Sequence, residues 1–143
     1  MQKPHSLRNA LTNAVQHLRE NPECLHIFVD NGTVVSTLVP SLSWEYRYTL
    51  NIVVTDFAGD QNLLIAPILH WLRENQPDIM ASPDNREKGF TFEVDILNHQ
   101  ACDISIDLKL TERIQVQEQG GNQVVAALPE PGDPEEYWTL KHG

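Results

Sequence analysis

The chain has 143 residues, of which 41% are hydrophobic and 21% are charged, a size and balance typical of one globular domain. Its 20 Asp and Glu residues outnumber 10 Lys and Arg, for a formal net charge of −10, which argues against a domain that binds nucleic acid by neutralising phosphates. The N-terminal residues lack a signal-peptide core, and no run approaches about 18 apolar residues. We therefore expect a cytoplasmic protein that does not enter a membrane.

The first part of the chain predicts a helix, a hairpin and a long strand. Ser6 is expected to cap a helix whose apolar residues recur every three or four positions and which stops at Asn21. Asn31-Gly32 then predicts the tight turn of a β-hairpin. The segment 44–57 is the longest strand candidate. One face of that strand holds Trp44, Tyr46, Tyr48, Leu50, Ile52 and Val54.

The second part predicts another helix and then a meander of strands. Asp60 is a candidate cap for the helix, which ends before Pro77, and Pro67 is expected to kink it or to mark its true first position. Residues 79–88 are expected to form a loop. The helix directs four apolar residues toward the core: Leu64, Ile68, Trp71 and Leu72. Strands are then expected over 90–96, 104–116 and 123–128, with turns at 98–100 and 120–122.

This order predicts an α+β fold in which a largely antiparallel or mixed sheet carries two main α-helices on one face. Residues 1–128 are expected to form a single domain, and the acidic, proline-rich residues 129–143 a C-terminal tail. Cys24 and Cys102 have no CxxC partner, so we expect buried or half-buried thiols rather than a disulfide.

Four carboxylates gather in the predicted late hairpin. Glu93 and Asp95 lie on one strand and Asp103 and Asp107 on the next, so that strand alternation places them on one polar face. Carboxylates so placed could bind a divalent cation or share acid and base roles. However, neighbouring outward side chains diverge, whereas metal ligands must converge to about 2–2.6 Å. A solvated face is the favoured interpretation. Like charges that oppose each other across two strands weaken a sheet. An acidic face that is kept despite this cost suits a surface that meets a negatively charged partner and must not bind it.

No sequence pattern indicates catalysis. The six histidines are scattered without HxxxH or HExxH spacing, and GxSxG, GxxxxGK[ST] and GxGxxG motifs do not occur. We therefore predict no catalytic residue, no metal ligand and no cofactor.

The aromatic start of the long strand is the most distinctive local feature. Trp44, Tyr46 and Tyr48, with Arg47 between them, are residue types that dominate interface hot spots. The three aromatic side chains could instead face the core of the sheet, which is the more common arrangement. Near the C-terminus, Tyr137 and Trp138 are further candidates for contact with a neighbouring subunit.

Several long blocks resemble one known family. LHIFVDNG, SWEYRYTLNIVVTDFAGD, PILHWLRENQP and GFTFEVDILNHQ, followed by DISIDLKLTERIQV, are similar in order and spacing to the tail completion protein R family of contractile-tailed phages and prophages. The resemblance spans about residues 3–116 and carries no catalytic residues.

What the resemblance implies is a structural protein of the virion tail, assembled in the host bacterial cytoplasm and similar in fold to tail terminators. Such proteins form rings, here expected to be hexamers, that cap the head-proximal end of the tail tube and prepare head–tail joining. The implied partners are further copies of itself, the tail tube protein and the head–tail connector protein, without a membrane or tight nucleic-acid binding.

If the chain forms such a ring, genomic DNA must pass through it, and the four carboxylates are expected to line the path of the DNA. Two alternatives stay open at this point. One is a soluble assembly adaptor or chaperone that is absent from the virion. The other is a metal-dependent hydrolase that uses Glu93, Asp95, Asp103 and Asp107.

Overall fold

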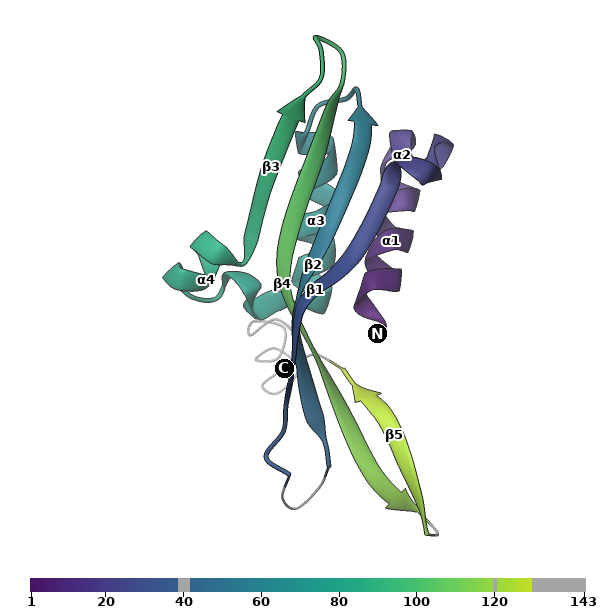
Figure 1. The fold of residues 1–143 in the computed structure, drawn as a ribbon, viewed down its shortest axis with the longest axis vertical. Coiled ribbons are helices and arrows are strands. Elements are labelled where there is room, and N and C mark those ends of the chain that lie inside the picture. The colour runs from purple at the N-terminus through teal and green to yellow at the C-terminus, as the bar shows by residue number, and fades with distance from the viewer. Residues whose placement is uncertain (39–41, 120, 130–143) are drawn as a thin grey trace, which may run out of the picture.

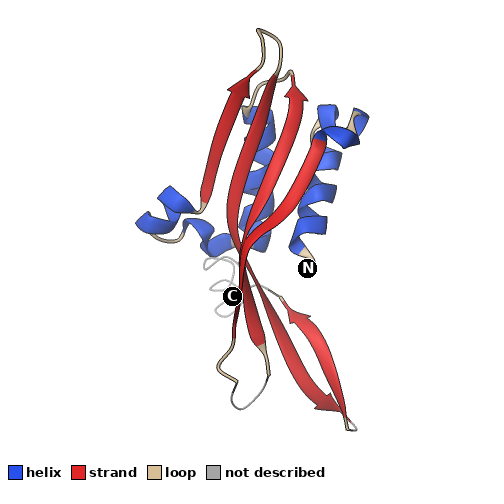
Figure 2. Cartoon of the chain, in the orientation of Figure 1, coloured by secondary structure: helices blue, strands red, loops and turns tan. Residues whose placement is uncertain are grey.

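The structure is a computed structural model that describes residues 1–38, 42–119 and 121–129. Its strands form a twisted sheet with the long helices on one side (Figures 1 and 2). In chain order the elements are α1 (Lys3–Ala14), α2 (Gln16–Glu20), η1 (Pro22–Cys24), β1 (Leu25–Val35), β2 (Trp44–Phe57), α3 (Asn62–Asn75), η2 (Pro77–Met80), α4 (Pro83–Lys88), β3 (Phe90–Ile96), β4 (Cys102–Gln119) and β5 (Asn122–Leu128). The predicted C-terminal tail, with Tyr137 and Trp138, lies outside the described residues.

The sheet has five strands in the order β1-β2-β4-β3, with β5 also paired to β4, and every pairing is antiparallel. The long strand β4 is central: its first part pairs with β3, its last part pairs with β5, and β2 runs along its other edge. The predicted α+β class with two main helices is thus confirmed.

The core lies between the helices and one face of the sheet. Even-numbered residues of β2 and β4 point into it, as the alternation predicted, and α1 and α3 supply its other side. Its fully buried members include Leu7, Leu11, Leu18, Leu50, Ile52, Val54, Leu64, Ile68, Ile106 and Leu108. Across 48–54 and 102–110 the odd-numbered residues lie on the opposite, helix-free face, whereas Phe57 follows a register shift and joins the core. Of the two thiols, Cys102 is buried and Cys24 is half-buried, as expected.

The first helix begins earlier than predicted. It starts at Lys3, with Pro4 in its first turn, so Ser6 lies inside the helix and is not its cap. The Ser6 hydroxyl instead accepts a hydrogen bond from Trp71 Nε1 at 3.0 Å. The helix also breaks at Val15, which has φ −110° and ψ 115°, and α2 follows. The prediction of one continuous helix to Asn21 is therefore wrong in its start and its continuity.

Asn31-Gly32 does not form the predicted hairpin turn. β1 continues through this dipeptide, and its register with β2 shifts between Asp30 and Thr33, which is a β-bulge. Asn31 has φ 54°, so the positive φ that favours Asn-Gly in turns is used here to accommodate the extra residue of the bulge. The strand reverses instead between Val35 and Trp44.

The segment predicted as a loop over 79–88 contains the 3₁₀ turn η2 and the short helix α4. Ser82 caps α4, because its Oγ accepts a hydrogen bond from the backbone N–H of Asn85 at 3.1 Å. Within α3, Pro67 is accommodated inside a helix that begins at Asn62. Among the described residues, no helix is long and apolar enough to span a membrane.

Candidate assembly surfaces

All four predicted carboxylates lie on the helix-free face of the β3–β4 hairpin, and we call Glu93, Asp95, Asp103 and Asp107 the acidic face. Asp95 lies directly opposite Asp103 across the two strands, and Glu93 lies opposite Ser105. Asp107 lies opposite Thr91 on one side and Asn51 on the other. The structure therefore brings the predicted residues together as neighbours on one surface.

Local donors hold two of these carboxylates in place. Asp103 Oδ1 accepts a hydrogen bond from the backbone N–H of Asp56 at 3.0 Å. Asp107 Oδ1 accepts one from Asn51 Nδ2 at 2.8 Å. Within the described part of the chain, no three His, Cys, Asp or Glu side chains form a group that could hold a metal ion. The acidic face is therefore arranged as an electronegative surface rather than as a chelating cluster.

The aromatic residues of β2 divide between the surface and the core. Tyr48 is only 3% exposed and belongs to the hydrophobic core, so its predicted place in a subunit interface is wrong. Trp44 and Tyr46 are half-buried and pack edge to face, with ring centroids 5.7 Å apart. Arg47 is exposed and its Nε lies 2.6 Å from Glu45 Oε1. Trp44, Tyr46 and Arg47 thus remain accessible candidates for contact with another subunit.

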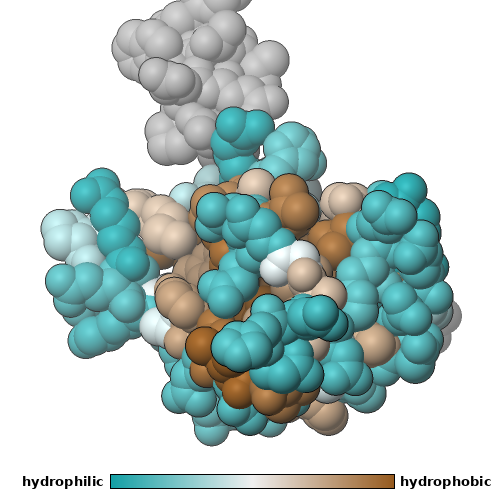
Figure 3. Space-filling view, turned by 90° about the horizontal axis from the view of Figure 1, so that it is seen from above, coloured by the Kyte–Doolittle hydropathy of each residue, from teal (hydrophilic) through white to brown (hydrophobic). Residues whose placement is uncertain are grey.

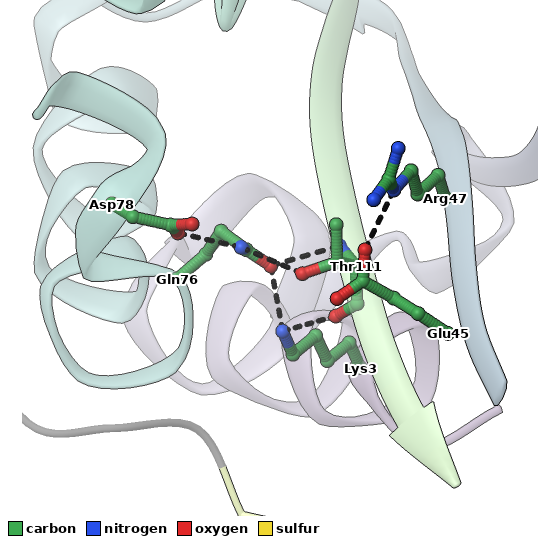
Figure 4. A network of polar contacts seen from close by, with 6 residues as sticks. All are labelled: Lys3, Glu45, Arg47, Gln76, Asp78 and Thr111. Carbon is green, nitrogen blue, oxygen red and sulfur yellow. Dashed lines mark hydrogen bonds and ion pairs between the residues drawn. The ribbon is translucent and has the colours of Figure 1, made fainter. Parts of the chain in front are cut away.

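A polar network closes a gap in the sheet that sequence reasoning did not find (Figure 4). β3 begins opposite Leu108 and β5 ends opposite Arg113, so residues 109–112 of β4 have neither strand beside them. The side chain of Gln76, which is 2% exposed, lies there instead. Its Oε1 accepts from the Thr111 backbone N–H at 2.9 Å, and Lys3 Nζ donates to the Thr111 carbonyl. These side chains replace strand pairing where backbone groups would otherwise lack partners.

The same network holds the start of α1 against the sheet. Lys3 Nζ also donates to Gln76 Oε1 at 2.6 Å. On the core side, the buried Glu112 accepts hydrogen bonds through Oε1 from the backbone N–H groups of Gln2 and Lys3, at 2.8 and 3.4 Å, and through Oε2 from the Tyr48 hydroxyl at 2.8 Å. A carboxylate at a helix N-terminus is favourable because it faces unpaired N–H groups and the positive end of the helix dipole. We call Lys3, Tyr48, Gln76, Thr111 and Glu112 the waist network.

Beyond the waist network, the strands continue past the helices as two projecting hairpin ends (Figure 1). One is the end of β1 with the start of β2, and the other is the β4–β5 hairpin. Large apolar side chains are exposed on both. They are Val34, Leu38, Leu42, Val124, Val125 and Leu128. Because such a cluster on extended hairpins favours contact with another protein, we call these ends the distal arms.

A groove of about 340 Å³ lies on the sheet beside the waist network. Arg47, Lys88 and Lys109 line it, but their charges interact within the subunit. Arg47 pairs with Glu45, Lys88 Nζ lies 3.1 Å from Asp84 Oδ1, and Lys109 Nζ donates to Thr49 Oγ1 at 2.8 Å. Two of these three cations are therefore paired with carboxylates of the same subunit.

The described residues thus combine a charged open face, projecting apolar arms and a hydrogen-bonded network between them. The model of the P2 phage tail completion protein R family matches residues 1–131. The chain belongs to the tail completion protein R family. Tail completion protein R of Escherichia phage P2 is 58% identical over 135 residues, which cover 94% of this chain and 87% of that protein. In the comparison with solved structures, none matched.

Membership of this family confirms the resemblance found in the sequence blocks. It also identifies the chain as a structural phage protein, in agreement with the prediction that it is not an enzyme. Two of the blocks that carried the resemblance contain core elements: the SWEYRYTLNIVVTDFAGD block contains β2, and PILHWLRENQP contains most of α3 and Gln76.

Proposed function

We propose that this chain is the terminator subunit of the phage tail, and that it caps the head-proximal end of the tail tube as a ring and prepares it for head joining. The ring is a hexamer of this chain. Its partners are the last ring of the tail tube protein on one side and the head–tail connector protein on the other. The family's role in completing the tail supports this proposal.

The observation that carries the proposal is the asymmetry of the sheet. One face holds the helices and the core, while the other is free of helices and carries the acidic face on its β3–β4 hairpin. Residues 90–108 include four carboxylates and no Lys or Arg. A ring through which DNA passes must not retain phosphates, and an electronegative lining keeps them from binding. The acidic face therefore lines or borders the DNA path.

The distal arms supply the second requirement of a terminator, which is attachment to the tube. They reach beyond the compact part of the subunit and expose apolar side chains suited to a protein partner. Trp44 and Tyr46 lie where one arm leaves the core. The arms, with these aromatic residues, contact the tube protein or a neighbouring subunit.

Charge reversal on the acidic face tests whether this surface lines the path of the DNA. In phage that carry Asp103→Lys and Asp107→Lys together, tails should be complete but DNA release should be slow and should recover with added salt, because the new cations bind phosphate. The matched control is the Asp103→Asn and Asp107→Asn pair, which removes charge without reversing it. Its DNA release should match the parent. The measurements are a count of tailed, full particles and a DNA-release assay.

Three results would contradict the proposal. Normal DNA release by the Lys variant at low salt would show that the acidic face does not meet the DNA. Recovery of complete virions that lack the chain would favour the soluble adaptor. If the Asn variant lost a Mg²⁺-dependent hydrolytic activity present in the parent, the carboxylates would instead serve the hydrolase that the sequence left open.

A further inference from the structure

We propose that copies of this chain associate head to tail by strand pairing, with the free edge of β3 in one copy against the free edge of β1 in the next. This inference rests on the proposed ring and specifies the contact that builds it. The pairing would join the separate sheets into one continuous sheet around the assembly.

Both edges are available for pairing among the described strands. β1 pairs only with β2, and β3 pairs only with β4. On β3, the backbone bonds from Lys109 to Gly89 and from Leu97 to Ala101 show that odd-numbered residues face β4. Phe92 and Val94 therefore direct their backbone N–H and C=O groups outward, because these groups alternate along an antiparallel strand. An unprotected edge of this kind is a template for another strand.

The helices are displaced toward one edge of the sheet. In Figure 1, α3 lies behind β2 and β4, and α1 lies beside β1 at the margin, while the upper part of β3 has no helix behind it. As a result, Phe92 and Ile96 are 61% and 76% exposed, although they oppose the core residues Ile106 and Cys102 across the β3–β4 ladder. Seen from the end that carries the 97–101 turn, apolar surface lies between hydrophilic margins (Figure 3).

A neighbouring copy placed against β3 would cover this bare face. Its β1 edge brings its own uncovered apolar residue, Val29, which is 44% exposed, and its α1 occupies the space behind β3 that is empty in the single subunit. One copy thus lacks a helix behind β3, at the edge where α1 of the next copy would lie. This fit requires contact between two different edges, which is a heterologous interface, the type from which a ring is built when the rotation between copies closes.

Strand direction and length agree with the pairing. The strands β1, β2, β4 and β3 alternate in direction across the sheet, so a following β1 in the same orientation runs antiparallel to β3. The alternation continues without interruption from one copy to the next. Residues 25–30 precede the bulge in β1, and β3 covers Phe90–Ile96, so the two segments have similar lengths.

The two edges of the sheet differ in charge. The hairpin over residues 90–108 has four carboxylates and no Lys or Arg, whereas residues 3–20 have three Lys and Arg against one Glu. Arg8 lies at the β1 edge, where its Nη1 is 3.4 Å from the Leu25 carbonyl oxygen. β3 against β3 would place the carboxylates of two copies side by side, which contact between unlike edges avoids. The pairing also keeps every acidic face on the same side of the joined sheet.

The test is site-specific photocrosslinking of the full-length chain, both purified and in assembled tails. A benzophenone amino acid replaces Phe92 on the β3 edge, and the matched control replaces Leu63, which is 63% exposed on α3. We expect position 92 to form an adduct of two copies whose crosslinked peptide lies within residues 3–35. Position 63 should form no such adduct.

The outcomes separate this inference from the ring itself. Self-adducts from position 92 that map outside residues 3–35 would overturn edge pairing but leave a ring of copies in place. Absence of a self-adduct from position 92 in assembled tails would also overturn edge pairing, and any ring would then have to form through another surface.

A second measurement guards against effects on folding. Phe92→Lys should lower the yield of completed tails by at least about tenfold, since it places a charge in the paired edge. Leu63→Lys should leave the yield unchanged. Both side chains are largely exposed, so both variants should match the parent in urea midpoint. Equal yields for the two folded variants would refute the edge contact.

Discussion

Replacing Glu112 tests whether the waist network fixes the helices to the sheet. The Glu112 side chain belongs to a residue that is 7% exposed, and it accepts three hydrogen bonds. The donors are the Tyr48 hydroxyl and the backbone N–H groups of Gln2 and Lys3. A hydrogen bond to a charged group contributes about 1.5–3 kcal/mol, but bonds that share one acceptor are not additive. We therefore expect Glu112→Ala to lower the free energy of unfolding by about 3 kcal/mol.

The assay is urea denaturation followed by circular dichroism, with two control variants. Glu112→Gln keeps the shape and an acceptor oxygen, so it should lose about 1–2 kcal/mol. Tyr48→Phe removes one donor and should lose a similar amount, about 1–2 kcal/mol. Because the two side chains bond to each other, the combined loss in the double variant should fall short of the sum of the single losses. A loss of less than about 1 kcal/mol for Glu112→Ala would refute the assigned role.

Two further predictions concern the packing of the compact part of the subunit. Ile52 is fully buried in the middle of β2, so Ile52→Ala should cost about 2–5 kcal/mol in urea melts, and a loss below about 1 kcal/mol would mean that β2 does not organise the core. Gly89 is enclosed where α4 leads into β3, and a Cβ there would lie 2.7 Å from both Asn85 O and Ile79 Cγ1. Gly89→Ala should therefore lower the free energy of unfolding by about 1–3 kcal/mol. Thermal melts unchanged from the parent would show that the neighbouring atoms can move to make room for the added methyl group.

The sequence allowed the core to be predicted because local periodicity carries that information. The alternation from Tyr48 to Val54, and from Ile104 to Leu110, placed the right residues against the helices. The positions of Leu64, Ile68, Trp71 and Leu72 in α3 followed from helical spacing in the same way. The acidic face was found because its members lie close together in the sequence and alternate along two adjacent strands.

Features decided by distant contacts could not be predicted. The preference of Asn31 for positive φ fits a hairpin turn and a bulge equally well, and pairing with β2 selects the bulge. Serine is a residue type that commonly caps helices, but the Ser6 hydroxyl accepts a hydrogen bond from Trp71. In the waist network, Gln76 bonds to Lys3 and to Thr111, which are 73 and 35 positions away in the sequence. No local pattern indicates such a network.

The central claim is that this chain ends the tail as a ring at its head-proximal end. The most direct measurement is immunogold labelling of purified, head-free tails with an antibody raised against the full chain, viewed by electron microscopy. The proposed function predicts gold at the head-proximal end of the tube and at no other place. Gold along the tube or at the baseplate, or intact tails that carry no label, would contradict it.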